Sequence, residues 1–187
     1  HLLLGVIVAK GIDNTKKQTT ITQLMSGVFA QQKNKFARDK LEENPTIKVW
    51  RETYQSFGAD PLKNPCSVEA LLKRVIKGDQ IPRINTLVDI YNYFSIKNIM
   101  PIGGEDIDQL CGDIKLTFSN GEIPFRAIGS EKIEYPEEGE VVYKDSGGTT
   151  CRRWNYRECD RTKFVPQTKN AMIVLEDMGM LGEEKLK

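Results

Sequence analysis

The pattern of hydrophobic and polar positions predicts helices in the first half of the chain. In residues 45–57, 67–77 and 87–95, apolar side chains recur every three or four positions, which is typical of helices with one buried face. Asn44, followed by a proline, is a common helix start, and Gly78 is a common helix end because glycine adopts the left-handed conformation there. We therefore expect three amphipathic helices in this half.

The stretches before these helices are less regular. The opening run LLLGVIVA predicts a buried strand; it is too short to cross a bilayer and lacks the basic leader of a signal peptide. The chain begins within this strand on His1 rather than on a methionine, so we expect further residues upstream. Residues 19–32 are poorly periodic, whereas the charged stretch 33–43, KNKFARDKLEE, predicts a solvated helix.

The second half changes to the period of strands. IKLTF and IPFRAI flank the turn sequence SNGE at 119–122, which predicts a β-hairpin because both central residues of an Asn-Gly turn tolerate positive φ. EVVYKD, a glycine turn and TTCRRWNY predict a second strand pair, and AMIVLED predicts a buried final strand. These patterns predict an α+β fold in which a mixed β-sheet, built mainly from the C-terminal half, packs against helices of the N-terminal half. A chain of this length is expected to form a single domain, 1–187.

Composition narrows the classes of function. With 27 basic and 26 acidic residues, the formal charge is only +1, so the protein has no overall field that would attract DNA or an anionic membrane. The four cysteines form no CxxC pair and His1 is the only histidine, which argues against a metal site. We expect no metal, no cofactor, no membrane and no DNA partner, and scattered cysteines favour a reduced, cytoplasmic protein.

One segment carries a local excess of positive charge. Residues 151–159 read CRRWNYREC, and from Arg152 to Lys163 there are five basic and two acidic residues. If 149–156 is a strand, alternate side chains face opposite sides. Arg152 would then lie beside two aromatic rings on one face, and Arg153 beside Asn155 on the other. The alternative is that Trp154 belongs to the core and the arginines pair with the acidic loop EYPEEGE.

A longer stretch of the chain resembles a known family. Residues 82–94, PRINTLVDIYNYF, and the following MPIGGEDIDQLCGDIKLTF are similar to the editing domain of the phenylalanyl-tRNA synthetase β subunit, the B-three/four domain. There the corresponding runs read approximately R-P-I-N-N-V-V-D-I-T-N-Y and Q-P-L-H-A-F-D-L-D-K-L. QTKNAMIVLED also resembles the family's T-K-N-V-L-L-E segment. The family's histidine falls on Gly103, which removes the imidazole.

The resemblance implies a function in translation quality control. In the synthetase, this domain hydrolyses the ester between tRNA and a wrongly attached amino acid. Here 187 residues leave no room for an aminoacylation domain, so the chain resembles a free-standing editing protein that acts in trans on aminoacyl-tRNA. Because the family's histidine is missing, a non-catalytic module of the same fold that binds tRNA or a small ligand remains the alternative.

The candidate site residues follow from the motifs and from the basic segment. Glu105 could accept a proton from water or bind the substrate's α-ammonium group, and ammonium binding is favoured because it needs no shifted pKa. Asn155, or a backbone amide near the glycine pairs, is expected to stabilise the oxyanion. A nucleophilic cysteine is disfavoured because Cys151 and Cys159 have no base beside them in the sequence. The other residues expected to bind the amino acid, the ester or the terminal nucleotide are Arg83, Asn85, Gly103, Gly104, Arg152, Arg153, Trp154 and Glu158.

Overall fold

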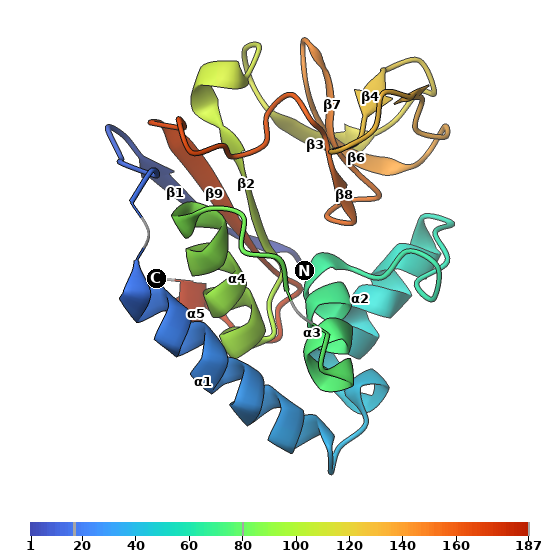
Figure 1. Cartoon of the computed structure of the whole chain (residues 1–187). Helices are drawn as coiled ribbons and strands as arrows, with labels where there is room; N and C mark the ends of the chain where they lie inside the picture. The colour runs from blue at the N-terminus through green and yellow to red at the C-terminus, as the bar shows by residue number, and fades with distance from the viewer. Residues whose placement is uncertain (17, 80, 187) are drawn as a thin grey trace.

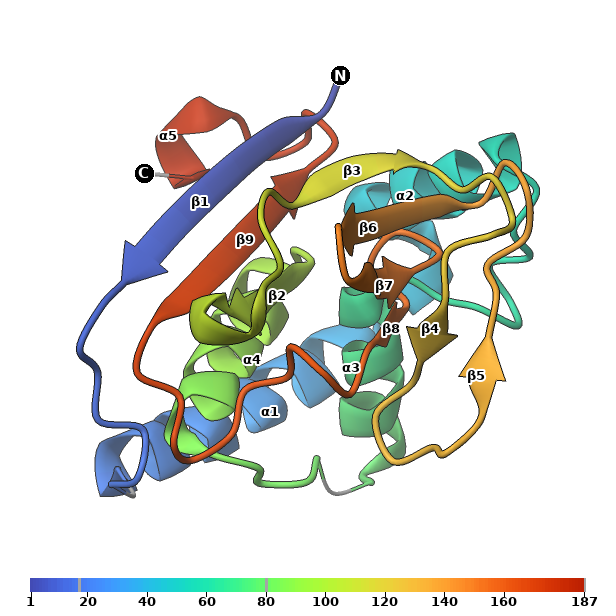
Figure 2. The same ribbon diagram turned by 90° about the horizontal axis from the view of Figure 1, so that it is seen from above.

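The computed structural model describes residues 1–16, 18–79 and 81–186. A three-stranded sheet has the order β1 (Leu3–Ala9), β9 (Ala171–Asp177), β2 (Ile102–Asp106). The helices α1 (Thr19–Phe36) and α4 (Thr86–Asn98) lie on one side of this sheet (Figure 1). The short helix α5 (Glu183–Leu186) lies beside β1 on the other side (Figure 2).

The second part of the fold contains the other six strands of the described residues. A four-stranded sheet has the order β3 (Lys115–Phe118), β6 (Val141–Asp145), β7 (Gly148–Arg152), β8 (Arg157–Glu158). A smaller sheet pairs β4 (Phe125–Arg126) with β5 (Ile133–Glu134), and α2 (Pro45–Ser56) and α3 (Ser67–Lys77) lie below the four-stranded sheet (Figure 1). Every recorded strand pairing in the described residues is antiparallel. The α+β class expected from the sequence is confirmed.

The first and last strands lie side by side, with Leu3 opposite Asp177 and Ala9 opposite Ala171. The prediction of a buried first strand is wrong, because β1 forms an edge of its sheet and β9 takes the central position. Val6 is 57% exposed and Val8 is 55% exposed. An apolar run without alternation does not distinguish a central strand from an edge strand.

The first helix is longer than expected and lies earlier in the chain. α1 ends at Phe36, so the helix predicted over 33–43 is helical only over 33–36, and turns and the short 3-10 helix Leu41–Glu43 follow. The buried face of α1 includes Gln32, whose side-chain amide donates to the carbonyl of Ile96 at 3.0 Å. This polar residue at a buried position weakens the apolar period of the helix.

The helices α2, α3 and α4 confirm the sequence pattern. The side chain of Asn44 accepts hydrogen bonds from the first backbone N–H groups of α2, at 3.1 and 3.4 Å. Gly78 ends α3 in the left-handed conformation, with φ 85°. Asn85 begins α4 by accepting from the N–H of Val88 at 3.0 Å. Each helix therefore starts or ends where a residue suited to the role stands in the sequence.

The predicted hairpin around Asn120-Gly121 is wrong, although the turn itself exists. Gly121 has φ 80°, but β3 pairs with β6, and β4 pairs with β5. The N–H of Ser119 continues the β3–β6 ladder by donating to the carbonyl of Glu140 at 2.7 Å. The strand pair β6–β7, also predicted, is confirmed, with Tyr143 opposite Cys151.

The segment CRRWNYREC is not one strand. β7 ends at Arg152, and the backbone then turns through Arg153 with φ 45° and Trp154 with φ 65° before β8 begins. The alternation expected for 149–156 therefore fails after Arg152. The turn places the indole ring of Trp154 edge-on against Trp50 of α2, with ring centroids 5.3 Å apart. This contact joins the four-stranded sheet to the helices below it.

No helix among the described residues is both long enough and apolar enough to cross a membrane.

Candidate functional site

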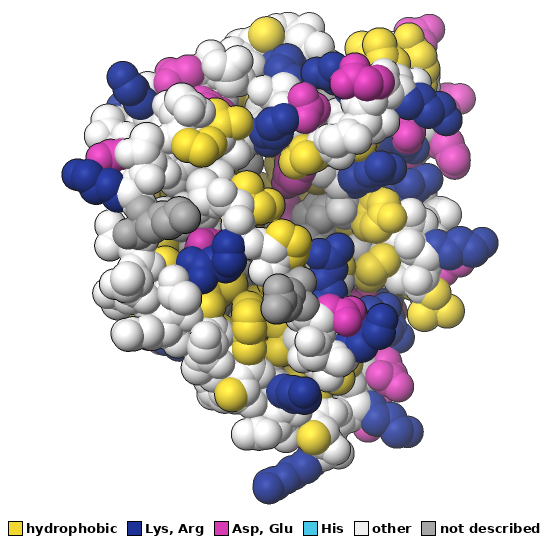
Figure 3. Space-filling view, in the orientation of Figure 1, with side chains coloured by type: hydrophobic (Ala, Val, Ile, Leu, Met, Phe, Trp, Pro, Cys, Tyr) yellow, Lys and Arg dark blue, Asp and Glu magenta, His cyan; other side chains and the backbone are white. Residues whose placement is uncertain are grey.

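A small cavity lined by acidic and apolar side chains lies where the two larger sheets meet. Its walls come from β2, β6, β7, β8, β9 and the turn at 153–156, and its volume is about 30 Å³. A cavity of this size holds one or two water molecules. Figure 3 shows acidic atoms in a narrow depression near the centre of one face of the protein. The lining residues are Gly103, Gly104, Glu105, Ile114, Tyr143, Cys151, Trp154, Asn155, Glu158, Val174 and Glu176.

Glu105, the acid to which the sequence assigned a catalytic role, is buried in the wall of this cavity. It stands on β2, is 5% exposed, and its Oε2 atom has no hydrogen-bond partner among the described residues. Burial raises the pKa of Glu105 to about 7, although the hydroxyl groups of Thr162 and Thr150 act in the opposite direction. A carboxyl group with a pKa near neutrality can both give and take a proton at physiological pH.

Glu158 faces the same cavity from β8. A Cβ atom placed on Gly103 would lie 3.1 Å from Oε1 of Glu158. The glycine that stands in place of the family's histidine thus leaves space that a glutamate oxygen occupies. Burial raises the pKa of Glu158, and the charges of Glu105 and Glu176 raise it further. Burial and the nearby charges therefore favour the protonated form of Glu158.

Glu176 is the third acid at the cavity and is firmly held. Its carboxylate accepts three hydrogen bonds: from Tyr143 Oη at 2.6 Å, from Trp154 Nε1 at 2.8 Å and from Asn155 Nδ2 at 2.5 Å. Burial raises the pKa of Glu176, and these donors partly offset the effect. Through these three hydrogen bonds, Glu176 holds the turn at 153–156 against β9.

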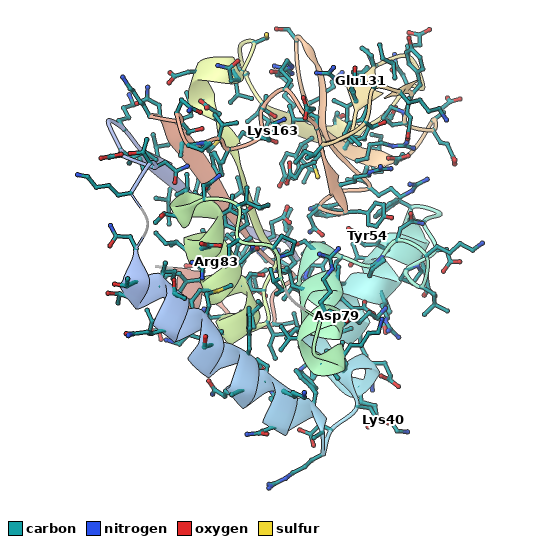
Figure 4. All side chains as sticks on the ribbon, viewed as in Figure 1. Lys40, Tyr54, Asp79, Arg83, Glu131 and Lys163 are labelled. Carbon is teal, nitrogen blue, oxygen red and sulfur yellow. The ribbon has the colours of Figure 1, made fainter. Side chains whose placement is uncertain are left out.

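Asn155 connects this network to the helices. Its Oδ1 accepts hydrogen bonds from Tyr54 Oη at 2.9 Å and from the N–H of Ser67 at 3.1 Å. Figure 4 shows Tyr54 directed from α2 toward the sheet above it. Asn155 and Glu105 line the same cavity, as the sequence-based assignment requires. Most of the hydrogen-bonding capacity of Asn155 nevertheless serves the fold.

Gly104 is required by packing. A Cβ atom there would lie 2.3 Å from the carbonyl oxygen of Met172 and 2.9 Å from the ring of Phe164. Both distances are far below van der Waals contact. The absence of a side chain at this position lets β2 pair closely with β9 and lets the Phe164 ring cover the strand.

Arg152 does not face the cavity. Its guanidinium donates to both oxygens of Glu140, at 2.9 and 2.8 Å, and to Glu134 at 2.7 Å. Arg153 lies 3.9 Å from the carboxylate of Glu137. The expectation that Arg152 binds substrate is replaced by the alternative in which it pairs with the acidic loop, since Arg152 is buried and fully engaged. Arg153 is only partly buried, and its expected contact with substrate stays a prediction. Trp154, expected to contact substrate, is 9% exposed and packs in the core.

Arg83 and Asn85 lie at a different depression. Arg83 pairs with Asp89 at 2.6 Å, and Asn85 caps α4 and donates to the carbonyl of Phe164 at 3.1 Å. Both residues line a separate hollow of about 450 Å³ between α1 and α4. The single pocket expected to combine them with Gly103 and Glu105 is therefore two sites.

The cysteines beside the cavity are buried and have raised pKa values. Burial raises the pKa of the Cys151 thiol, and the nearby charge of Glu158 raises it further. Burial likewise raises the pKa of Cys159. A thiol that resists ionisation is a poor nucleophile. Among the described residues, no cluster of three or more His, Cys, Asp or Glu side chains is arranged to hold a metal ion.

Sequence reasoning missed Glu176 and Tyr143. Glu176 stands near the end of the apolar strand AMIVLED. An acid at this position indicates only that a buried strand reaches its polar end. Tyr143 stands inside VVYKD and reads as an ordinary strand residue. Only the three-dimensional meeting of β6, β9 and the turn at 153–156 brings them together. A long-range pairing of this kind leaves no local signal.

The comparisons with known proteins identify the family. The chain belongs to the B3/4 domain family, since residues 49–178 match the B3/4 domain. Among solved structures, it is similar to an N-terminal fragment of the phenylalanyl-tRNA synthetase β subunit from Pyrococcus horikoshii, with 10% sequence identity and a TM-score of 0.45. That similarity covers 95% of this chain and 40% of the fragment, so the chain spans less than half of that relative's length. No curated protein shows significant sequence similarity to the chain. The family expected from PRINTLVDIYNYF and the segments after it is confirmed.

Proposed function

We propose that this protein, as a single domain, hydrolyses the ester bond of mischarged aminoacyl-tRNA in trans. The observation that carries the proposal is Glu105, a buried acid in the wall of a cavity large enough for a water molecule. The motifs shared with the editing domain of the synthetase supply the substrate class. We also propose that the protein acts in the cytoplasm, as the sequence leads us to expect.

In the proposed reaction, Glu105 acts as a general base toward a water in the cavity. The water oxygen attacks the ester carbonyl carbon, and its proton passes to the Glu105 carboxylate. One N–H of the Asn155 amide is used by Glu176, and the other would donate to the oxyanion that forms. When the ester bond breaks, Glu105 returns the proton to the leaving ribose oxygen. The amino-acid side chain would lie outside the cavity, where half-buried Gly103 and Glu158 reach solvent.

Two observations favour a second candidate, a non-catalytic module that binds tRNA or a small ligand. The cavity of about 30 Å³ is smaller than any aminoacyl group, and Asn155 is already committed to Tyr54, Ser67 and Glu176. If no rearrangement admits the ester, binding would occur without hydrolysis.

The deciding experiment is deacylation of a panel of mischarged tRNAs by the wild type, Glu105→Gln and Glu122→Gln. Glu122 is exposed, so its substitution removes the same charge away from the cavity. We expect one charged species to be hydrolysed by the wild type and by Glu122→Gln, with a rate at least about 100-fold lower in Glu105→Gln. tRNA binding is measured on the same samples at two salt concentrations. Salt-dependent binding without hydrolysis would establish the second candidate, and neither signal would contradict both.

A further inference from the structure

The first strand, β1, forms an edge of the three-stranded sheet and exposes apolar side chains there. Leu4, Val6, Ile7 and Val8 are between 45% and 57% exposed. The strand Leu3–Ala9 contains no charged or polar side chain and no proline. Figure 2 shows β1 at the outside of its sheet, with β9 on its inner side. Natural sheets usually protect such an edge with charges, prolines or bulges, so this edge is typical of a strand that pairs with another chain.

The backbone of β1 also offers hydrogen-bonding groups on its outer side. In β9, the N–H of Glu176 donates to the carbonyl of Pro101 on the β2 side, at 3.0 Å. Leu4 stands opposite Glu176, and alternate residues of a strand turn their backbone groups to opposite sides. The N–H and C=O groups of Leu4, Val6 and Val8 therefore point away from β9. No hydrogen bond outside the β1–β9 pairing is recorded for them among the described residues.

We propose that two copies of this protein pair through β1, antiparallel and related by a two-fold axis at Val6. In this register, Val6 faces Val6 of the second copy, and Leu4 faces Val8. Each of these three residues would donate one backbone hydrogen bond to the second copy and accept one. The three-stranded sheets of the two copies would then form one continuous sheet.

The sequence of β1 favours a second copy over a different partner. An uncharged strand has no side chain that would select another protein, whereas a second copy places an apolar residue opposite each apolar residue. A shift of the pairing by two residues would bring the charged Lys10 opposite Leu4 in one direction, and His1 opposite Ala9 in the other. The register centred on Val6 therefore pairs the seven residues of β1 only with one another.

Charges at the ends of the strand are complementary in the same arrangement. The segment that leads into α5 lies at the start of β1, since a Cβ atom on Gly179 would lie 3.4 Å from the carbonyl oxygen of His1. The first turn of α5 carries the exposed Glu183 and Glu184. The pairing would bring the exposed Lys10 of the second copy to this same end of the strand. Because of the two-fold axis, the same pair of opposite charges would recur at the other end.

Charges placed at Val6 test the register. In Val6→Lys, two ammonium groups would face each other across the two-fold axis and repel, and in Val6→Glu two carboxylates would do the same. Mixing the two variants would place opposite charges face to face and restore the pairing. Val8→Lys is the matched control: Val8 is 55% exposed and lies on the same face as Val6, which is 57% exposed, but it would face Leu4.

Sedimentation velocity over a concentration series measures the dimer Kd of the whole chain, of each variant and of the mixture. A pair of single strands is a small interface, so we expect a wild-type Kd in the micromolar range. Val6→Lys and Val6→Glu should each raise this Kd by about tenfold or more, and Val8→Lys by clearly less. The mixture of the two Val6 variants should recover the wild-type Kd to within about threefold.

A wild type that stays monomeric up to about millimolar concentration would overturn the proposal. A dimer that Val6→Lys and Val8→Lys weaken equally would also overturn it, because the two-fold axis would then not lie at Val6. A mixture of the Val6 variants that remains monomeric would have the same meaning, provided that melting temperatures at low concentration show both variants to be folded. These outcomes are independent of whether the protein hydrolyses aminoacyl-tRNA, because β1 does not line the cavity at Glu105.

Discussion

Arg152 offers the sharpest test of how the structure reassigns the basic segment. Its side chain is 8% exposed and makes three hydrogen bonds, two of them to Glu140, which is 5% exposed. Arg152→Ala would leave the Glu140 carboxylate buried without its cationic partner. Removing one member of a buried ion pair typically costs 3–5 kcal/mol of unfolding free energy.

Glu140 keeps two other donors, which places the expected cost at the lower end of that range. The backbone N–H groups of Arg153 and Glu137 donate to it at 3.0 and 3.2 Å. We therefore expect Arg152→Ala to lower the free energy of unfolding by about 3 kcal/mol. The matched control is Arg157→Ala, which removes the same charge from the same segment. Arg157 is 47% exposed and lies 3.9 Å from Glu134, so its loss should cost less than about 0.5 kcal/mol.

Urea denaturation of the wild type and both variants measures these differences. Salt-dependent tRNA binding on the same samples separates the two roles of the arginine. If Arg152 served substrate binding, Arg152→Ala would leave the denaturation midpoint near that of the wild type and would weaken binding. A loss below about 1 kcal/mol together with weaker tRNA binding would refute the reasoning.

The remaining predictions concern the cavity and the strands beside it. For Glu105→Gln, the sign follows from the raised pKa: a buried acid whose folded pKa is about 7, against 4.5 when unfolded, loses its stabilising contribution as pH rises through 7. The stability that Glu105→Gln gains relative to the wild type should therefore be about 1–3 kcal/mol larger at pH 8 than at pH 4.5. Urea denaturation of both proteins at both pH values measures this gain. An equal gain at the two pH values would contradict the pKa shift. Gly104→Ala should cost about 2 kcal/mol or more because its Cβ meets the Met172 carbonyl at 2.3 Å, whereas Gly27→Ala in α1, with nothing within 4 Å, should be neutral or stabilising by up to about 1 kcal/mol. Thermal denaturation of the pair checks the direction, and similar melting temperatures would count against the close approach of β2 and β9. Tyr143→Phe should cost about 1–3 kcal/mol, since Glu176 loses the donor at 2.6 Å, and a calorimetric scan that shows no change would mean that the network does not stabilise the fold.

Local chemistry in the sequence determined where several elements begin and end. The side chains of Asn44 and Asn85 cap the starts of α2 and α4. Gly78, which has no side chain, ends α3. The motif PRINTLVDIYNYF was sufficient to indicate the B3/4 family, because it combines the apolar face of α4 with the residues that lead into it. Glu105 could be selected because it directly follows the glycine pair that stands where the family's motif has its histidine. These features depend on residues close together in the chain.

Only the tertiary structure decided which charges face a site and which support the fold. Arg152 reads as a binding residue until β5 and the loop before β6 bring Glu134 and Glu140 against it. Glu176 reads as a strand end until β6 and the turn at 153–156 supply its donors. The strand partners of β1 and β3 were likewise invisible, since a strand pattern specifies a face and not a neighbour. Pairings between distant segments depend on packing across the whole chain, and no local pattern records that packing.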